Sequence, residues 1–138
     1  REAAQRDYEK AMDLFPRNTP LTVRYAEALL AAGQPKKAHA ILLDLLNNVP
    51  PTAEQVRLIA LAASAAGDTA DAHYYMAELH LLRGDVIMAA DQLRLALSIP
   101  GLDSVQKARF TSRLAEIQEW LDREQRSRRQ QAASGKQQ

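Results

Sequence analysis

The residues best suited to metal chemistry in this sequence are three histidines, His39, His73 and His80. Zinc sites need three or four convergent ligands, and zinc proteases place two of them in a His-Glu-x-x-His motif on one helix. Glutamate follows none of the three histidines, and the chain has no cysteine that could serve as a further ligand. His73 and His80 are seven residues apart, so on a helix they share one face, which we expect to pack against a neighbouring helix. We therefore expect neither a metal site nor a cofactor in this chain.

Candidate nucleophiles lack the sequence context that catalysis needs. No serine stands in a Gly-x-Ser-x-Gly motif, and no glycine-rich loop that could cradle a phosphate is present. The serines considered are Ser64, Ser98, Ser104 and Ser112. The sequence thus names no catalytic residue, and we expect that this chain is not itself an enzyme.

Methionine side chains can line an adaptable binding strip, or they can fill gaps in a core. The three in this chain are Met12, Met76 and Met88. Met76 falls at a core position of a helical repeat, so we favour core filling for the set.

Three residue types recur along the chain at one interval of 34 residues. They are Ala4, Ala38 and Ala72, then Pro16 and Pro50, and finally Gly33 and Gly67. The tetratricopeptide repeat (TPR) has this period, with two antiparallel helices per repeat, small residues where the helices touch and proline at the repeat end. The sequence resembles that family. The resemblance implies an all-α fold, a TPR-like α-solenoid of about seven antiparallel helices whose superhelix has a concave face.

Helix-forming residues fill the stretches between the repeated glycines and prolines, and they predict seven helices. The expected ranges are Arg1–Phe15, Thr19 to a turn at Gly33, Pro35 to Pro50, Ala53 to a turn at Gly67, Thr69–Arg83, Val86–Ser98, and Ser104 to about Arg126. Gly84 comes 17 residues, half a period, after Gly67, so the helix over Thr69–Arg83 is expected to serve two repeats. Because Arg1 would lie within the second helix of a repeat, we expect the chain to be a piece of a longer protein. One repeat domain should occupy residues 1–126.

Helix-start signals predict the same boundaries independently of the repeat. Pro20 and Pro35 suit the first turn of a helix, and Thr52 with Gln55 forms a capping-box pattern. Further N-cap candidates are Asp68, Asp85 and Asp103.

The repeat phase selects the side chains that should face the concave surface, which the first helix of each pair mainly lines. The selected residues are Val23, Glu27, Arg57, Leu61, Tyr74 and Glu78. Apolar and aromatic anchors flanked by charges suit a protein or peptide partner, and Arg57 and Tyr74 are the residue types that most often dominate such binding. The alternative is that some of the six only contact neighbouring helices.

The C-terminal residues 127–138 form a basic tail without an apolar period, and we expect this tail to be disordered. A basic tail could touch RNA or an anionic lipid, but no aromatic residue is interleaved with its charges, so we favour a solvated end. The formal net charge of +1 gives no reason to expect nucleic acid as a partner. The longest apolar runs, such as Ile59–Ala66, are much shorter than a membrane span, so we expect none.

A narrower set of residues lies within Ala72–Leu121. It comprises Met76-Ala77-Glu78, Gly84, Gln92-Leu93, Ala96-Leu97, Ala108-Arg109 and Arg113-Leu114. This stretch is similar to the C-terminal repeat domain of BepA-type (YfgC-type) periplasmic zinc metalloproteases. In that family an upstream His-Glu-x-x-His domain holds zinc and cuts proteins, while the repeat domain packs against it and engages the outer-membrane β-barrel assembly machinery and its substrates.

The BepA-type resemblance implies a periplasmic location and a partner-recruiting role for this chain. It supplies no catalytic residue, because the protease motif is not in this sequence, and zinc would be expected only in a protease domain outside it. A free-standing repeat adaptor with another protein partner is the alternative.

Overall fold

The computed structural model describes residues 2–136 and divides them into seven α-helices. The helices are α1 (Glu2–Leu14), α2 (Thr19–Ala31), α3 (Pro35–Asn48), α4 (Ala53–Ala65), α5 (Thr69–Leu82), α6 (Val86–Ser98) and α7 (Ser104–Lys136). The predicted number of helices is confirmed, and the first six have bounds within about two residues of those expected from the sequence.

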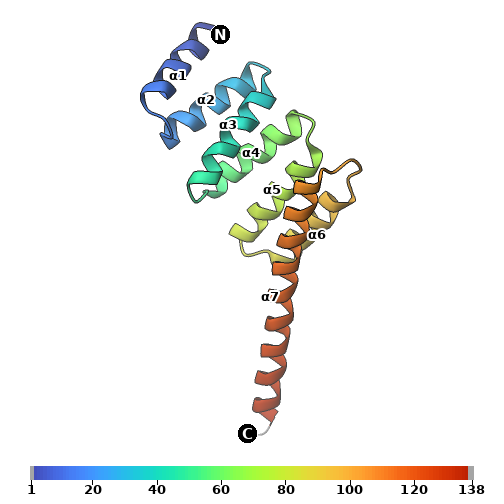
Figure 1. Cartoon of the computed structure of the whole chain (residues 1–138). Coiled ribbons are helices and arrows are strands. Elements are labelled where there is room, and N and C mark those ends of the chain that lie inside the picture. The colour runs from blue at the N-terminus through green and yellow to red at the C-terminus, as the bar shows by residue number, and fades with distance from the viewer. Residues whose placement is uncertain (1, 137–138) are drawn as a thin grey trace.

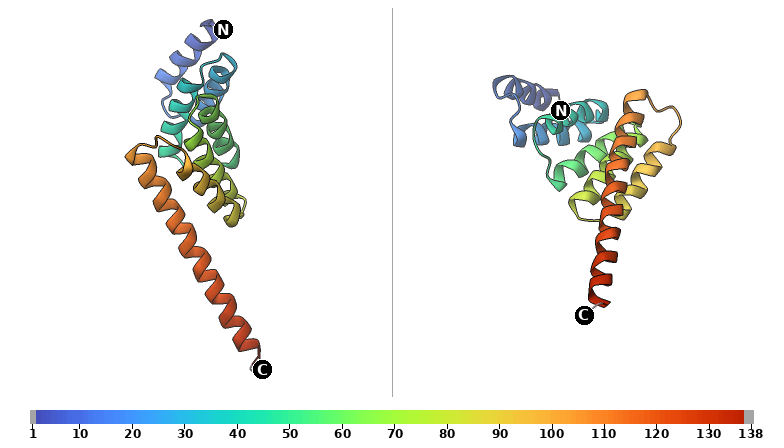
Figure 2. Two further views of the ribbon diagram at one scale, coloured as in Figure 1. Left: turned by 90° about the vertical axis from the view of Figure 1, so that its right-hand side faces the viewer. Right: turned by 60° about the horizontal axis from the view of Figure 1, so that its bottom comes forward.

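The helices stack side by side in chain order, with α1 at one end of the molecule and α6 and α7 at the other (Figure 1). Each helix packs mainly against its neighbours in the chain. This arrangement confirms the all-helical solenoid. The second half of α7 continues alone beyond the stack, as both views in Figure 2 show.

The predicted capping residues start the helices. The Thr52 hydroxyl accepts a hydrogen bond from the Gln55 amide while the Gln55 side chain accepts one from the Thr52 amide, which completes the capping box of α4. Aspartate carboxylates accept a hydrogen bond from a backbone amide in the first turn of α5, α6 and α7; they are Asp68, Asp85 and Asp103. At the turn between α4 and α5 the backbone of Gly67 has φ +85°, a left-handed conformation that glycine adopts without strain. Local sequence signals therefore set where these helices begin and turn.

Two adjoining clusters of buried side chains form the core. The first joins α2, α3, α4 and α5 around Leu29 and Ile59, and the second joins α5, α6 and α7 around Leu93 and Phe110. Helix α5 supplies Tyr75 and Leu79 to the first cluster, and Ala70 and Ala77 to the second. This double contribution supports the predicted role of α5 in two repeats.

The positions of the repeated alanines differ from the expectation at Ala72. Ala38 and Ala89 are fully buried where helices meet, as the repeat predicts, but Ala72 is only partly buried. The buried alanines of α5 are instead Ala70 and Ala77, because α5 packs against neighbours on both sides and presents a different face to each. Ala4 is exposed, since α1 lies at the end of the stack, packs mainly on α2 and buries no residue fully.

Replacing Ala89 by leucine should lower the free energy of unfolding by about 1–3 kcal/mol, because its site has no room for a larger side chain. Ala72→Leu is the matched control and should change that free energy by less than about 0.5 kcal/mol, because the added carbons can reach solvent. Urea denaturation of the two variants measures the difference. Equal losses in both would contradict this packing.

Helix α7 is longer than predicted. The sequence suggests a helix to about Arg126 and a disordered tail over residues 127–138, whereas α7 runs to Lys136. From Asp122 to Lys136 every residue is exposed, so this part of the helix has no packed face. Residues 137 and 138 lie outside the described part of the chain.

Candidate functional site

An open groove of about 810 Å³ lies across four helices of the stack, α2, α4, α5 and α6. Helix α2 contributes one lining residue, α4 six, α5 four and α6 one. The lining residues are Glu27, Glu54, Arg57, Leu58, Ala60, Leu61, Ser64, Thr69, Ala72, His73, Met76 and Gln92. Helices α2, α4 and α6 are the first helices of their pairs, so the groove lies on the face that the repeat predicts to be concave.

The groove has an apolar surface over its middle. The Leu61 side chain is 60 % exposed, an unusually open position for a leucine in the centre of a helix. Leu58 and Met76, which are partly buried, continue this surface into the core. Ala72 adds no bulk beside them, and its small side chain therefore helps to keep the groove open.

Polar groups lie around the apolar surface. Glu27, Glu54 and Arg57 are exposed, and none of them forms an ion pair with another side chain in residues 2–136. At the α6 side, Nδ1 of His73 lies 2.9 Å from Oε1 of Gln92, so these two side chains hydrogen-bond to each other. Charges of both signs are therefore available to a ligand at one end of the groove, and a satisfied polar pair lies at the other.

The six predicted groove residues separate into two groups. Glu27, Arg57 and Leu61 lie together in the groove. Val23, one helical turn before Glu27 on α2, is partly buried and is not part of the lining. Two further predictions, Tyr74 and Glu78, lie outside the groove, on the side of α5 that α7 covers.

Tyr74 and Glu78 hold α7 in place. The ring of Tyr74 stacks on Phe110 with a centroid separation of 5.3 Å, and the Arg109 guanidinium lies 4.5 Å from the same ring. Glu78 accepts two hydrogen bonds from Arg113, of 2.7 and 3.1 Å. These bonds to Glu78 raise the pKa of the Arg113 guanidinium above its ordinary value, and burial raises the pKa of Tyr74. Tyr74, one of the two predicted anchors, and Glu78 are thus structural side chains of the α5–α7 contact.

Asp71 is a buried acid that the sequence analysis did not single out. Its carboxylate accepts hydrogen bonds from Arg109 Nη2 at 2.7 Å and from Gln106 Nε2 at 3.0 Å, both on α7. Nε2 of His39, on α3, lies 3.7 Å away. The carboxylate therefore binds two side chains of α7 and lies close to α3. Its spacing of three and seven residues from Tyr74 and Glu78 is the sequence signal that could have marked this face of α5.

The histidine and methionine interpretations have mixed outcomes. His73 is partly buried and hydrogen-bonded between helices, which fits the predicted packing role. Met12 and Met76 pack against the core, as expected. Core filling is wrong for Met88, which is 47 % exposed near the start of α6 and belongs to neither core cluster.

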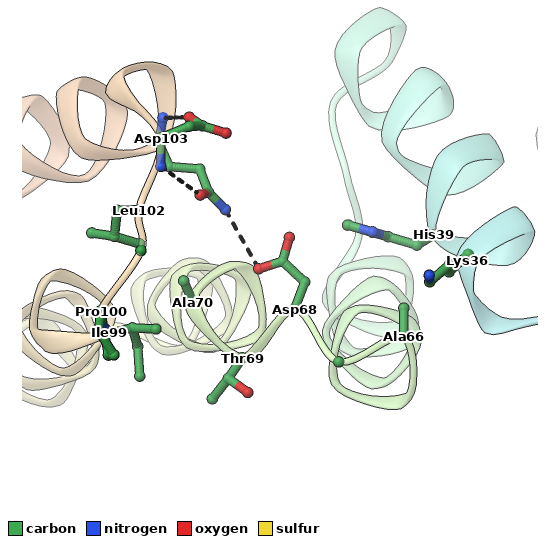
Figure 3. Close-up of a pocket in the computed structure, with 13 residues that line it drawn as sticks. Lys36, His39, Ala66, Asp68, Thr69, Ala70, Ile99, Pro100, Leu102 and Asp103 are labelled. Atoms are coloured by element: carbon green, nitrogen blue, oxygen red, sulfur yellow. Dashed lines mark hydrogen bonds between the residues drawn. The ribbon is translucent and has the colours of Figure 1, made fainter.

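A second hollow, of about 510 Å³, lies between the α4–α5 loop and the α6–α7 loop. Lys36 and His39 of α3 face Asp68 across it, and the loop between α6 and α7 closes its other side (Figure 3). The acids here already have structural partners. Asp68 caps α5 and also accepts a bond from Gln106, while Asp103 caps α7. Because its acids serve the local fold, this hollow is a weaker candidate than the groove.

The comparison with known families agrees with this geometry. Residues 1–62, which span α1 to α3 and most of α4, match the family model described as tetratricopeptide repeat. The fold is a TPR-like α-solenoid. TPR repeats form non-catalytic scaffolds that bind other proteins, so the matched repeats indicate a protein–protein interaction module. A search of curated proteins gave no match.

Metal binding and membrane insertion are two further functions to consider for residues 2–136. No group of three or more histidine, aspartate or glutamate side chains in this range is placed to hold a metal ion. None of the helices in this range is both long and apolar enough to cross a membrane.

Proposed function

We propose that the groove across α2, α4, α5 and α6 binds a segment of a partner polypeptide. The observation that supports this most is the combination of an open apolar surface at Leu61 and Met76 with unpaired charges beside it. Grooves that bind peptides bury apolar side chains of the ligand and use a few polar groups to set its direction.

The ligand this groove suits is a peptide with an apolar side chain beside charged ones. The apolar side chain would cover the exposed carbons of Leu61, which gains hydrophobic free energy. Arg57 would pair with an acidic group of the ligand, and Glu27 or Glu54 with a basic one. The groove therefore selects by the order of charges around a central apolar residue.

Replacing Leu61 and Arg57 together by alanine should weaken peptide binding roughly thirtyfold, corresponding to ~2 kcal/mol for the loss of a central anchor. The probe is a set of twelve-residue peptides selected on the unmodified chain from a displayed random library, with affinity measured by fluorescence anisotropy. The matched control replaces Leu82 and Arg83 by alanine, because both are exposed and lie outside the groove. Selected peptides that bind the Leu61 and Arg57 variant as tightly as the unmodified chain would remove the proposal.

The setting we propose for this module is the recruiting domain of a BepA-type periplasmic zinc metalloprotease. Its partners would be the outer-membrane β-barrel assembly machinery and its substrates, and zinc would lie in a protease domain outside this chain. This proposal is supported by the resemblance of the stretch Ala72–Leu121 to the repeat domain of that family. Leu93 and Ala96 of that stretch are buried in the terminal repeat, while Arg109 and Arg113 dock α7. A free-standing adaptor is the second candidate.

The gene that encodes this chain distinguishes the two settings. An export signal followed by a His-Glu-x-x-His domain upstream of Arg1 would support the protease setting. Crosslinking of the full-length protein to the β-barrel assembly machinery, lost on replacing Leu61 and Arg57, would support the proposed partner. A start codon immediately before Arg1 would contradict the protease setting and support the free-standing adaptor.

A further inference from the structure

The last part of α7 is a helix without a partner. From Asp122 to Lys136 every side chain is exposed, and the helix extends beyond the stack on its own (Figure 2). A single helical segment of this length is marginal in water, and one that is polar on all sides gains nothing from packing on the repeat domain. A second helix lying along α7 would stabilise this segment.

The charges of α7 change sign along one face of the helix. Three acids, spaced three residues apart, are followed by three arginines with the same spacing. The acids are Glu116, Glu119 and Asp122, and the arginines are Arg123, Arg126 and Arg129. Each arginine lies seven residues after one acid, so the two sets occupy the same face of the helix in consecutive pairs of turns.

Most of these charges have no partner within the chain. Glu116 accepts a hydrogen bond of 2.8 Å from Arg113, and Asp122 accepts one of 3.4 Å from the Gln118 side-chain amide. The five residues other than Glu116 form no ion pair with any side chain in residues 2–136. Glu119 and Arg123 have a spacing of four residues, which permits a pair within one helix, but that pair is not formed in this structure.

We propose that two copies of this chain associate through an antiparallel pairing of their α7 helices. A two-fold axis between Asp122 and Arg123 places Glu116 opposite Arg129 of the partner subunit. It also places Glu119 opposite Arg126 of the partner subunit, and Asp122 opposite the partner's Arg123. The two-fold symmetry repeats each pair, so every acid meets an arginine. A parallel pairing in register would instead set each charge against its own copy.

The remaining side chains permit close approach of the two helices. The same two-fold axis puts Ser112 opposite the partner's Ala133 and Ala115 opposite the partner's Gln130. Ser112 and Ala115 are exposed, and they lie on the side of α7 opposite the buried Phe110 and Ile117. The paired face is therefore centred on the exposed side of α7, with Ser112 and Glu116 at its border with α5.

Sedimentation equilibrium of the full chain in low salt tests the pairing. Each exposed ion pair contributes little, so we expect a dimer with a dissociation constant on the order of 10–100 µM. Raising the salt from about 0.05 M to about 0.5 M shortens the screening length about threefold and should weaken the dimer at least roughly tenfold. A chain that stays monomeric up to about 500 µM in low salt would overturn the proposal.

Charge reversals test the register. Glu119→Arg and Arg126→Glu should each remove the dimer, because each sets like charges opposite one another. An equimolar mixture of these two variants should associate again, and so should the double variant carrying both changes. Glu124→Arg reverses a charge on another face of α7 and should dimerise like the unmodified chain. Helix content from circular dichroism establishes that each variant is folded. Dimerisation of folded Glu119→Arg alone, or failure of the mixture to associate, would overturn this register.

Discussion

Replacing Phe110 by alanine should lower the free energy of unfolding by about 3–5 kcal/mol, which is the usual cost of deleting a fully buried aromatic side chain. Phe110 is 0 % exposed and is the largest side chain of the second core cluster. Its ring also supports Tyr74, so the deletion removes a stacking contact along with the buried area.

The loss should be centred on the terminal repeat. Each repeat leans on the next, so detachment of α7 should loosen α6 and α5 before it affects α2. Urea denaturation measures the free energy, and hydrogen exchange locates it. Val105→Ala is the control on the same helix, because Val105 is 73 % exposed, and it should change the free energy by less than about 0.5 kcal/mol. A Phe110→Ala chain as stable as Val105→Ala would show that α7 does not complete the core.

The sequence predicts the helices well because their boundaries depend on local chemistry. Asp68 caps α5 through an atom only three residues away, and Gly67 turns the backbone by its own conformational freedom. Such signals act within a few residues, so they survive without any knowledge of tertiary contacts. Three of the six predicted groove residues line the groove, because α2 and α4 keep a regular place in the repeat. They are Glu27, Arg57 and Leu61.

The predictions for α5 depend on tertiary contacts, and the sequence pattern does not show which helix covers which side of α5. Tyr74 and Glu78 fit the pattern of groove residues only if α5 acts as the first helix of a pair, whereas α7 covers that side of it. Ala72 falls on the groove side for the same reason. The repeat period gives the spacing of residues along α5. The packing of α7 decides which face of α5 is covered and which remains open.

The helical state of residues 127–136 differs from the expected disordered tail because helix propensity outweighs the basic composition there. Arginine, glutamine and alanine are all good helix formers, and α7 is already nucleated by its packed first half. Extending an existing helix adds one hydrogen bond per residue and avoids the cost of nucleation.

Replacing Arg109 by leucine should lower the free energy of unfolding by about 3 kcal/mol, because it leaves the Asp71 carboxylate buried without its cation. The side chain of Asp71 is 8 % exposed, so its carboxylate is poorly solvated. The only other basic group of residues 2–136 within 4 Å of it, Nε2 of His39 at 3.7 Å, forms no hydrogen bond with it. Gln106 would remain as a hydrogen-bond donor at 3.0 Å, but it carries no charge. The Arg109 side chain is 33 % exposed, which places the expected cost at the lower end of the range for buried pairs.

A double-mutant cycle separates the pair from the packing around it. Replacing Asp71 by leucine as well removes the stranded charge, so the double variant should be more stable than Arg109→Leu alone by at least about 1 kcal/mol. Arg113→Leu serves as the comparison, because its partner Glu78 is more exposed than Asp71 and should tolerate the loss with a smaller cost. Urea denaturation of the four chains gives the coupling energy directly. Additive losses from Asp71→Leu and Arg109→Leu would mean that the carboxylate is not held by Arg109, and that apolar contacts alone fix α7 on α5.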